Sequence, residues 1–183
     1  MSIETLYEAK IGDKPFLAIK KIVDPENSVK GYLFSHETRC NGIIIALMPF
    51  RKLNGILEFL MRNEITPCWG LQYQLSSITG GYEGGDPRDT TIIELKQEAG
   101  YEASKNELVS LNTSFASKSS DTTYYLYTID LTNREQKLAT TDGTSLEKLA
   151  TCIWMTEQQI LDHQPKDPQV YVLLTRLKVH LKL

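Results

Sequence analysis

Two glutamates in the middle of the chain have the type and spacing that a metal-dependent reaction requires. Glu94 and Glu98 are four positions apart in a segment with a helical pattern. Each helical residue advances by about 100°, so the two carboxylates lie roughly 40° apart on one face. Carboxylate oxygens placed in this way converge on a hard cation such as Mg²⁺ or Mn²⁺. The spacing therefore predicts a cation site on this helix, with Gln97 beside it.

A glycine-rich passage comes directly before that helix. Residues 79–102 read TGGYEGGDPRDTTIIELKQEAGYE, and the first four glycines are expected to form a tight loop. Asp86 is a suitable N-cap, Pro87 suits the first helical position, and Gly100 suits a helix end. Glycines let backbone groups approach a phosphate closely. Alone, a Glu pair or a Gly pair is common on ordinary surfaces. Their order and spacing together predict a metal-and-diphosphate site.

In this order the passage resembles the Nudix box, G-x5-E-x7-R-E-U-x-E-E-x-G-U, in which U is apolar. Residues 94–101 match E-U-x-E-E-x-G-U with one change, and Gly80 with Asp86 matches G-x5-E with one change. Outside the box, roughly residues 30–180 are similar to the ADP-ribose pyrophosphatase branch. Residues 76–80 correspond to its E-(I/L)-P-A-G turn, and Trp154 ends a matching late strand.

The resemblance implies an α/β fold, an α/β/α sandwich around a mixed β-sheet. It implies a pyrophosphatase reaction, the hydrolysis of a nucleoside diphosphate linked to another moiety, with ADP-ribose or a nucleotide sugar as the first expected substrate. In this branch the positions of Glu94 and Glu98 hold the metal, together with a backbone carbonyl at the position of Thr79 or Gly80. The metal polarises a phosphoryl oxygen and helps to generate hydroxide from water.

The remaining site residues are also expectations from this resemblance. A general base is expected in the loop over residues 132–148, with Glu147 as the first candidate and Asp142 and Glu135 behind it. For each of the three, a solvated loop charge is the ordinary alternative. Four residues are expected to contact the substrate: Gly80, Gly81, Arg51 and Arg62. Arginine makes bidentate contacts to phosphate, although for either arginine an ordinary surface position is the more common alternative.

Several positions depart from the family pattern and open two other interpretations. Ile93 stands where the box has the arginine that orients its glutamates, Gln97 replaces the first glutamate of the E-E pair, and Ser76 replaces the glutamate of the turn. Asp86 stands where the box has a glutamate, so the acidic side chain at this position is shorter. One alternative is therefore a non-catalytic Nudix-fold module that binds a nucleotide or a protein. Another is a purely structural protein with a decayed box, which would bind no nucleotide.

Hydrophobic periodicity and turn residues predict the elements that position this site. Strands are expected at residues 15–23, 31–34, 43–49, 56–62, 71–78, 107–116, 122–131 and 149–155, and helices at 87–99, 157–162 and 167–182. Residues 51–55 are expected to turn. Residues 1–35 are expected to form a small N-terminal β subdomain, and residues 36–183 the Nudix domain.

Composition narrows the partners and the compartment. The chain has 183 residues and a net charge of −3, which argues against a broad nucleic-acid surface. The N-terminus is too polar for a signal peptide, and no apolar run is long enough for a membrane span. Three cysteines without paired spacing favour a cytoplasmic protein. The apolar run PFLAIKKIV, together with the family resemblance, predicts a homodimer. The resemblance also implies that the partner is a small molecule, a nucleoside diphosphate derivative.

Overall fold

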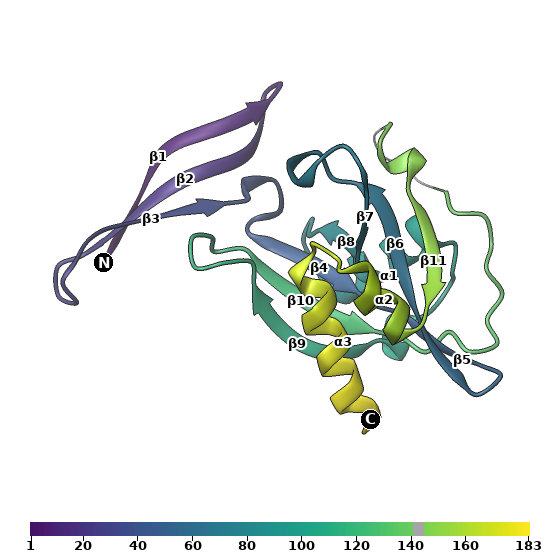
Figure 1. Ribbon diagram of the computed structural model, residues 1–183. Coiled ribbons are helices and arrows are strands. Elements are labelled where there is room, and N and C mark those ends of the chain that lie inside the picture. Colours follow the sequence, from purple (N-terminus) through teal and green to yellow (C-terminus); the bar gives the residue numbers. More distant parts are fainter. Residues whose placement is uncertain (141–144) are drawn as a thin grey trace.

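A mixed sheet forms the centre of the molecule, which the computed structural model describes over residues 1–140 and 145–183 (Figure 1). Its strand order is β8-β4-β10-β9, with β4 at Ile43–Leu47, β8 at Ile78–Gly81, β9 at Val109–Phe115 and β10 at Thr123–Thr128. Strands β4 and β10 are parallel, whereas β8 and β9 pair antiparallel at the edges. The sequence of β4, IIIAL, is apolar throughout because the strand is covered on both faces.

A second sheet is built around the long strand β6. Strand β6 spans Ile56–Ile65. Three strands pair antiparallel with parts of it: β5 at Phe50–Leu53, β7 at Tyr73–Ser76 and β11 at Thr151–Met155. The expectation of a turn over residues 51–55 is too broad. Only Asn54 and Gly55, both with positive φ, turn the chain, and this pair closes the β5–β6 hairpin.

Helices cover both faces of the sheets, so the expected α/β/α sandwich is confirmed. Helix α1 (Pro87–Ala99) packs on β8 and β4, and α3 (Pro168–Leu181) packs on β10 and β9. Strand β4 alternates between the two layers: Ile45 and Leu47 share a core cluster with Leu95 of α1, and Ala46 shares one with Leu173 of α3. None of the described helices is long and apolar enough to span a membrane.

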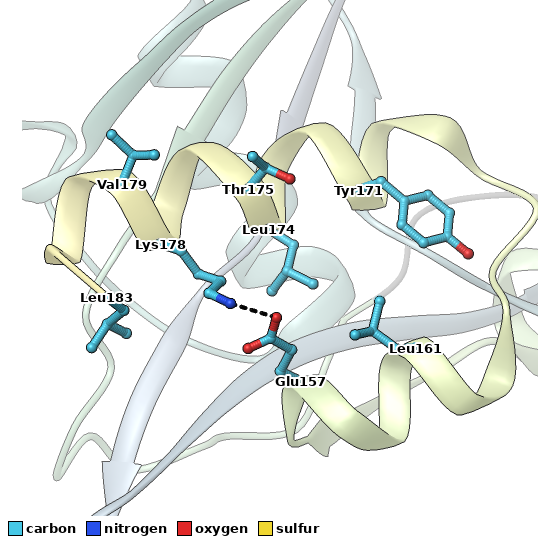
Figure 2. A pocket seen from close by; sticks show the side chains of 8 residues that line it. All are labelled: Glu157, Leu161, Tyr171, Leu174, Thr175, Lys178, Val179 and Leu183. Atoms are coloured by element: carbon cyan, nitrogen blue, oxygen red, sulfur yellow. Dashed lines mark hydrogen bonds and ion pairs between the residues drawn. The ribbon is translucent and has the colours of Figure 1, made fainter.

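The short helix α2 (Glu157–His163) lies beside α3, and the two are joined by an ion pair between Lys178 Nζ and Glu157 Oε1 at 2.7 Å (Figure 2). A buried contact also ties the start of α3 to the β-structure. The N–H and hydroxyl of Ser77 donate to the Asp167 carboxylate at 3.1 and 2.9 Å. This contact falls at the break between β7 and β8, inside the single strand expected over residues 71–78.

Strands β1 (Ser2–Ile11), β2 (Lys14–Asp24) and β3 (Val29–His36) form a separate antiparallel sheet that projects away from the body (Figure 1). Strand β1 was not expected, because it is exposed almost throughout and shows no burial of one face. Large apolar side chains are exposed on this sheet: Ile3, Leu6, Tyr7, Ile11, Tyr32 and Leu33. The division of the chain near residue 35 stays a prediction.

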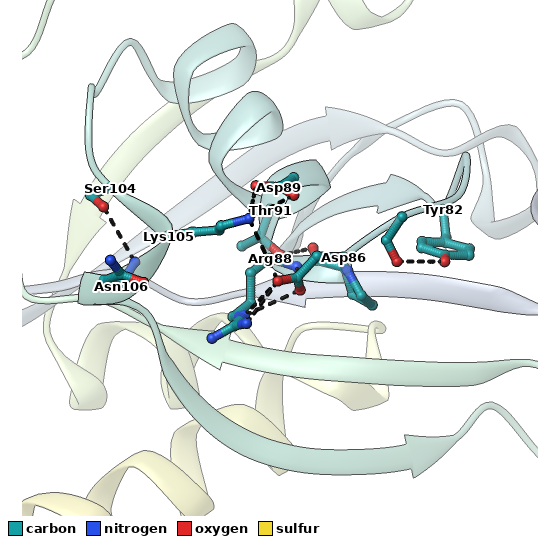
Figure 3. A network of polar contacts seen from close by, with 10 residues as sticks. Tyr82, Asp86, Arg88, Asp89, Thr91, Ser104, Lys105 and Asn106 are labelled. Atoms are coloured by element: carbon teal, nitrogen blue, oxygen red, sulfur yellow. Dashed lines mark hydrogen bonds and ion pairs between the residues drawn. The ribbon is translucent and has the colours of Figure 1, made fainter.

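Helix α1 begins and ends at the residues expected from its caps. The Asp86 carboxylate accepts the backbone N–H of Arg88 at 3.0 Å, and further contacts to Arg88 and Lys105 surround this end of the helix (Figure 3). Gly100 ends the helix with φ of 73°. Its carbonyl accepts the Lys137 N–H at 2.8 Å, and a Cβ at this position would overlap the Lys137 carbonyl oxygen.

This crowding generates a prediction about stability. Gly100→Ala combines an unfavourable φ with a backbone clash, so we expect it to lower the free energy of unfolding by roughly 3 kcal/mol. Gly55→Ala is the matched control. Gly55 has φ of 80° but open space around it, so only the conformational cost of about 1 kcal/mol applies. Urea unfolding of both variants measures the difference, and equal losses would contradict the packing of Gly100 against Lys137.

Candidate functional site

A cleft of about 1020 Å³ is lined by the predicted metal ligands Glu94 and Glu98 and by the residues 79–81 before the helix. Five of the side chains that line it are glutamates: Glu37, Glu64, Glu83, Glu94 and Glu98. Among the described lining residues the only cation is Arg39, which pairs with Glu37 at 3.1 Å and lies over the Phe16 ring at 4.9 Å. The cleft is therefore strongly acidic, and a diphosphate would need positive charge from another source to enter it.

The other hollows have a different character. The pocket between α2 and α3 has a volume of about 270 Å³ and is lined mainly by apolar side chains around the Lys178–Glu157 ion pair (Figure 2). Among the described residues that line this pocket, Glu157 is the only acidic side chain, and it is already paired with Lys178, so the pocket offers no comparable cation site. The acidic cleft is the stronger candidate for chemistry.

Glu94 lies directly against strand β8. A Cβ placed on Gly80 would come within 2.5 Å of Cγ and Cδ of Glu94 and closer still to its Oε1. A larger residue at this position would therefore displace the Glu94 side chain from its place across the strand. The expectation that all four glycines form a loop is wrong for Gly80 and Gly81, which are the last residues of β8. Both line the cleft beside Thr79.

Glu98 is joined to strand β6 through a buried arginine. Arg62 is 2% exposed, and its Nη1 lies 2.9 Å from Oε2 of Glu98. Its Nε lies 2.9 Å from Oε2 of Glu64, whose Oε1 accepts the Ser76 hydroxyl at 2.8 Å. Burial lowers the pKa of the guanidinium, but Glu98 and Glu64 more than offset this and raise it, so Arg62 stays charged.

Neither arginine expected at the diphosphate lines the cleft among the described residues. Arg62 lies beneath the carboxylates, because its position in β6 directs it toward α1 and not to solvent. Arg51 pairs with Glu58 across the β5–β6 hairpin at 2.7 Å, and its guanidinium lies 4.3 Å from the Trp154 ring centroid. The structure thus gives both arginines positions that differ from the expected role.

The candidates for a general base stay predictions. Glu147 begins the short 3-10 helix η4 (Glu147–Leu149), and its neighbour Leu146 lines the cleft, but the side chain of Glu147 lies outside what the structure describes. Asp142 also lies outside the described residues. Glu135 is exposed and is not among the described lining residues.

Two of the positions that depart from the family pattern make hydrogen bonds in the structure. The Ser76 hydroxyl donates to Glu64, whereas Ile93 is 53% exposed. Asp86 caps α1 outside the cleft lining, and its hydrogen bonds from Arg88 lower the pKa of its carboxyl to about 2 (Figure 3). The thiol of Cys152 donates to the backbone carbonyl of Glu98 at 3.5 Å. Burial raises the pKa of this thiol to about 12, so it stays protonated and is no nucleophile.

Glu64 is a charged residue of the cleft that sequence reasoning missed. A signal for it was present, because Arg62 and Glu64 are two positions apart in a strand and therefore point to the same face. Two opposite charges on one face of a strand as apolar as ILEFLMRNEI indicate a partner for both in the tertiary structure.

The carboxylates of the cleft suit a partial cation site. In the described part of the chain, no three His, Cys, Asp or Glu side chains are grouped closely enough to hold a metal alone. Mg²⁺ is commonly held by one or two carboxylates together with water and substrate phosphates. Glu94 and Glu98 line the same cleft as Thr79 and Gly80, the residues that the sequence predicted around a cation.

The fold is that of known nucleotide hydrolases. No family model and no curated protein matches the chain. The crystal structure of an ADP compounds hydrolase is similar over 100% of this chain and 92% of its own, with a TM-score of 0.69 and 15% identity. A C. elegans Ap4A hydrolase in a binary complex is similar over 76% of this chain and 97% of its own, with a TM-score of 0.53 and 19% identity. At these identities the likeness establishes the fold, the Nudix-like α/β architecture expected from the sequence.

The contact between Gly80 and Glu94 can be tested with adjacent glycines of one strand. We expect Gly80→Ala to push the Glu94 side chain off β8, because the new Cβ would occupy its place. Gly81→Ala is the matched control, since its Cβ would meet only Cys40 Cβ at an ordinary 3.4 Å. Crystal structures of the two variants give the position of Glu94. An unmoved Glu94 in Gly80→Ala would refute the close approach of α1 to β8.

Proposed function

We propose that the protein is a divalent-metal-dependent hydrolase that cleaves the diphosphate of a nucleoside diphosphate linked to another moiety. The observation that carries this proposal is the placement of Glu94 and Glu98 on one face of α1, in the same cleft as Gly80 and Gly81. The two similar structures are a hydrolase of ADP compounds and a hydrolase of Ap4A, which supports a nucleotide-derived substrate. ADP-ribose and nucleotide sugars are the first substrates to examine.

Each part of the cleft has a role in this proposal. Glu94 and Glu98 would hold Mg²⁺ or Mn²⁺, together with a backbone carbonyl at Thr79 or Gly80. The metal, when bound, supplies Lewis acidity toward a phosphoryl oxygen and toward water. Gly80 and Gly81 line the cleft and are the proposed phosphate contacts through their backbone groups, and Glu147 is the proposed base. Because five glutamates line the cleft, the diphosphate should bind together with the metal and not before it.

The first experiment is a substrate panel. ADP-ribose, nucleotide sugars and dinucleotides are incubated with Mg²⁺ or Mn²⁺, and phosphate is measured after phosphatase treatment of the products. We expect turnover of at least one compound and its loss in excess chelator. Full turnover in chelator would rule out the metal-dependent reaction.

Two substitutions on α1 test the proposed ligands. Glu98→Gln removes a charged ligand and should lower the rate by on the order of 10²-fold or more, the scale of lost electrostatic stabilisation. Gln97→Glu places a further carboxylate on the same face and should raise the apparent metal affinity or the rate. Steady-state kinetics across a metal titration gives both values. Unchanged activity in Glu98→Gln would show that α1 is not the metal platform. Ile93→Arg has no fixed expectation, because the structure places this position at the surface.

A non-catalytic nucleotide- or protein-binding module is the second candidate. The exposed Ile93 and the neutral Gln97 favour it, because neither can serve the role of a charged box residue. Such a module would bind nucleotide without metal. The acidity of the cleft opposes this, since Arg39, the one cation among the lining residues that the structure describes, is already paired with Glu37. Calorimetry with ADP-ribose in chelator distinguishes the two candidates.

We further propose that the protein is a cytoplasmic homodimer that pairs through its N-terminal sheet. Six large apolar side chains of β1 and β3 are exposed there, and a three-stranded sheet cannot bury them alone. The occupant we propose is the same sheet of a second copy. Light scattering at micromolar concentration should give twice the mass of one chain. A monomeric mass would exclude this pairing.

A further inference from the structure

Arg62 has an unusual position for an arginine, because it is buried between two separate elements. Its side chain, 2% exposed, starts on the central strand β6 and reaches helix α1. Nη1 meets Glu98 and Nε meets Glu64, both at 2.9 Å. Both glutamates line the acidic cleft, whereas Arg62 itself does not appear among the described lining residues. The guanidinium therefore supports the floor of the cleft from below.

The charges of this group are unequal. One buried guanidinium meets two carboxylates, so the three side chains together carry one net negative charge. A buried cation needs a counter-ion, and Glu64 is firmly held in that place by the hydroxyl of Ser76, itself 2% exposed. Because Arg62 contacts both carboxylates, it can hold Glu98 in place while Glu64 balances the charge of the guanidinium. The rigid fork of arginine suits this double contact, and the point charge of lysine suits it less.

We propose that Arg62 is the positioning residue of the cation site, that it holds the Glu98 carboxylate toward the cleft, and that Glu64 is its counter-ion. This inference rests on the proposed function, since it needs Glu98 to bind a divalent cation. It gives residues of strand β6 a role in a site that the sequence predicted only from helix α1 and the glycines before it. Neither Arg62 nor Glu64 contacts the substrate in this scheme.

Mn²⁺ binding to the whole protein, measured by the electron paramagnetic resonance signal of free Mn²⁺, tests the proposal directly. Arg62→Met removes a positive charge next to the site, and that change alone would strengthen cation binding. We nevertheless expect the affinity for Mn²⁺ to fall by about 10-fold or more, the usual effect of losing a residue that orients a ligand. Arg62→Lys should recover most of the loss. Affinity in Arg62→Met that is equal to wild type or higher would overturn the proposal.

Glu64→Gln tests the counter-ion. The amide keeps an acceptor for Ser76 but leaves Glu98 as the only carboxylate for Arg62, so Glu98 is drawn away from the cation. We expect Mn²⁺ affinity to fall by roughly 3- to 10-fold, although Glu64 is no ligand. Glu58→Gln is the matched control, because Glu58 pairs with Arg51 at 2.7 Å outside the cleft lining. An equal response of the two variants would overturn the role of Glu64.

Stability and turnover separate this proposal from the function on which it rests. Arg176→Met controls for the loss of an arginine, since Arg176 only ties α3 to the β9 carbonyls of Leu111 and Thr113. If Arg62→Met does not fold, the Glu64→Gln variant decides, and wild-type Mn²⁺ affinity in it would overturn the proposal. If wild-type protein binds Mn²⁺ but turns over no substrate, the proposed hydrolase function is excluded. The Mn²⁺ affinities of the variants then still decide whether Arg62 positions Glu98. Wild-type protein that binds no Mn²⁺ overturns both.

Discussion

The close approach of helix α1 to strand β8 is the constraint on which the candidate site depends. Gly80 has no side chain, so the Glu94 side chain can lie across the strand at this contact. The same contact buries Leu95 and Ala99 against the sheet and fixes which face of α1 meets the cleft. Core packing and the direction of the two carboxylates are therefore one arrangement. A shift of the helix would alter both.

Electrostatics sets the second condition. The cleft collects five glutamates, and its one described cation is already paired. Such a surface repels a free diphosphate but attracts a divalent cation, which can then supply the charge that the diphosphate requires. The buried Arg62 lies outside this lining and balances part of the charge without reducing access to Glu94 and Glu98. The guanidinium of Arg62, which holds the carboxylates, is thus a different positive charge from the cation that would meet the substrate.

The departures from the box also acquire a physical meaning in three dimensions. Ile93 brings no arginine to the site, whereas Arg62 reaches Glu98 from another strand. Ser76 is not acidic, but its hydroxyl holds Glu64 from the neighbouring strand. Charges absent from the linear motif are thus present near the site in space, contributed by β6. A motif defined along one segment of the sequence does not include charged residues that another strand brings to the same place.

The sequence by itself determined the main elements and the identity of the glutamate helix. Caps at Asp86 and Gly100 and the apolar run of β4 are local signals, and the structure follows them. It did not determine β1, because an exposed strand has no one-sided burial pattern to detect. Nor did it determine where Arg51, Arg62 and Glu64 lie, since the partner of a charged side chain depends on strand pairing and helix packing. Only the tertiary structure decided that Arg62 supports Glu98 from within the core.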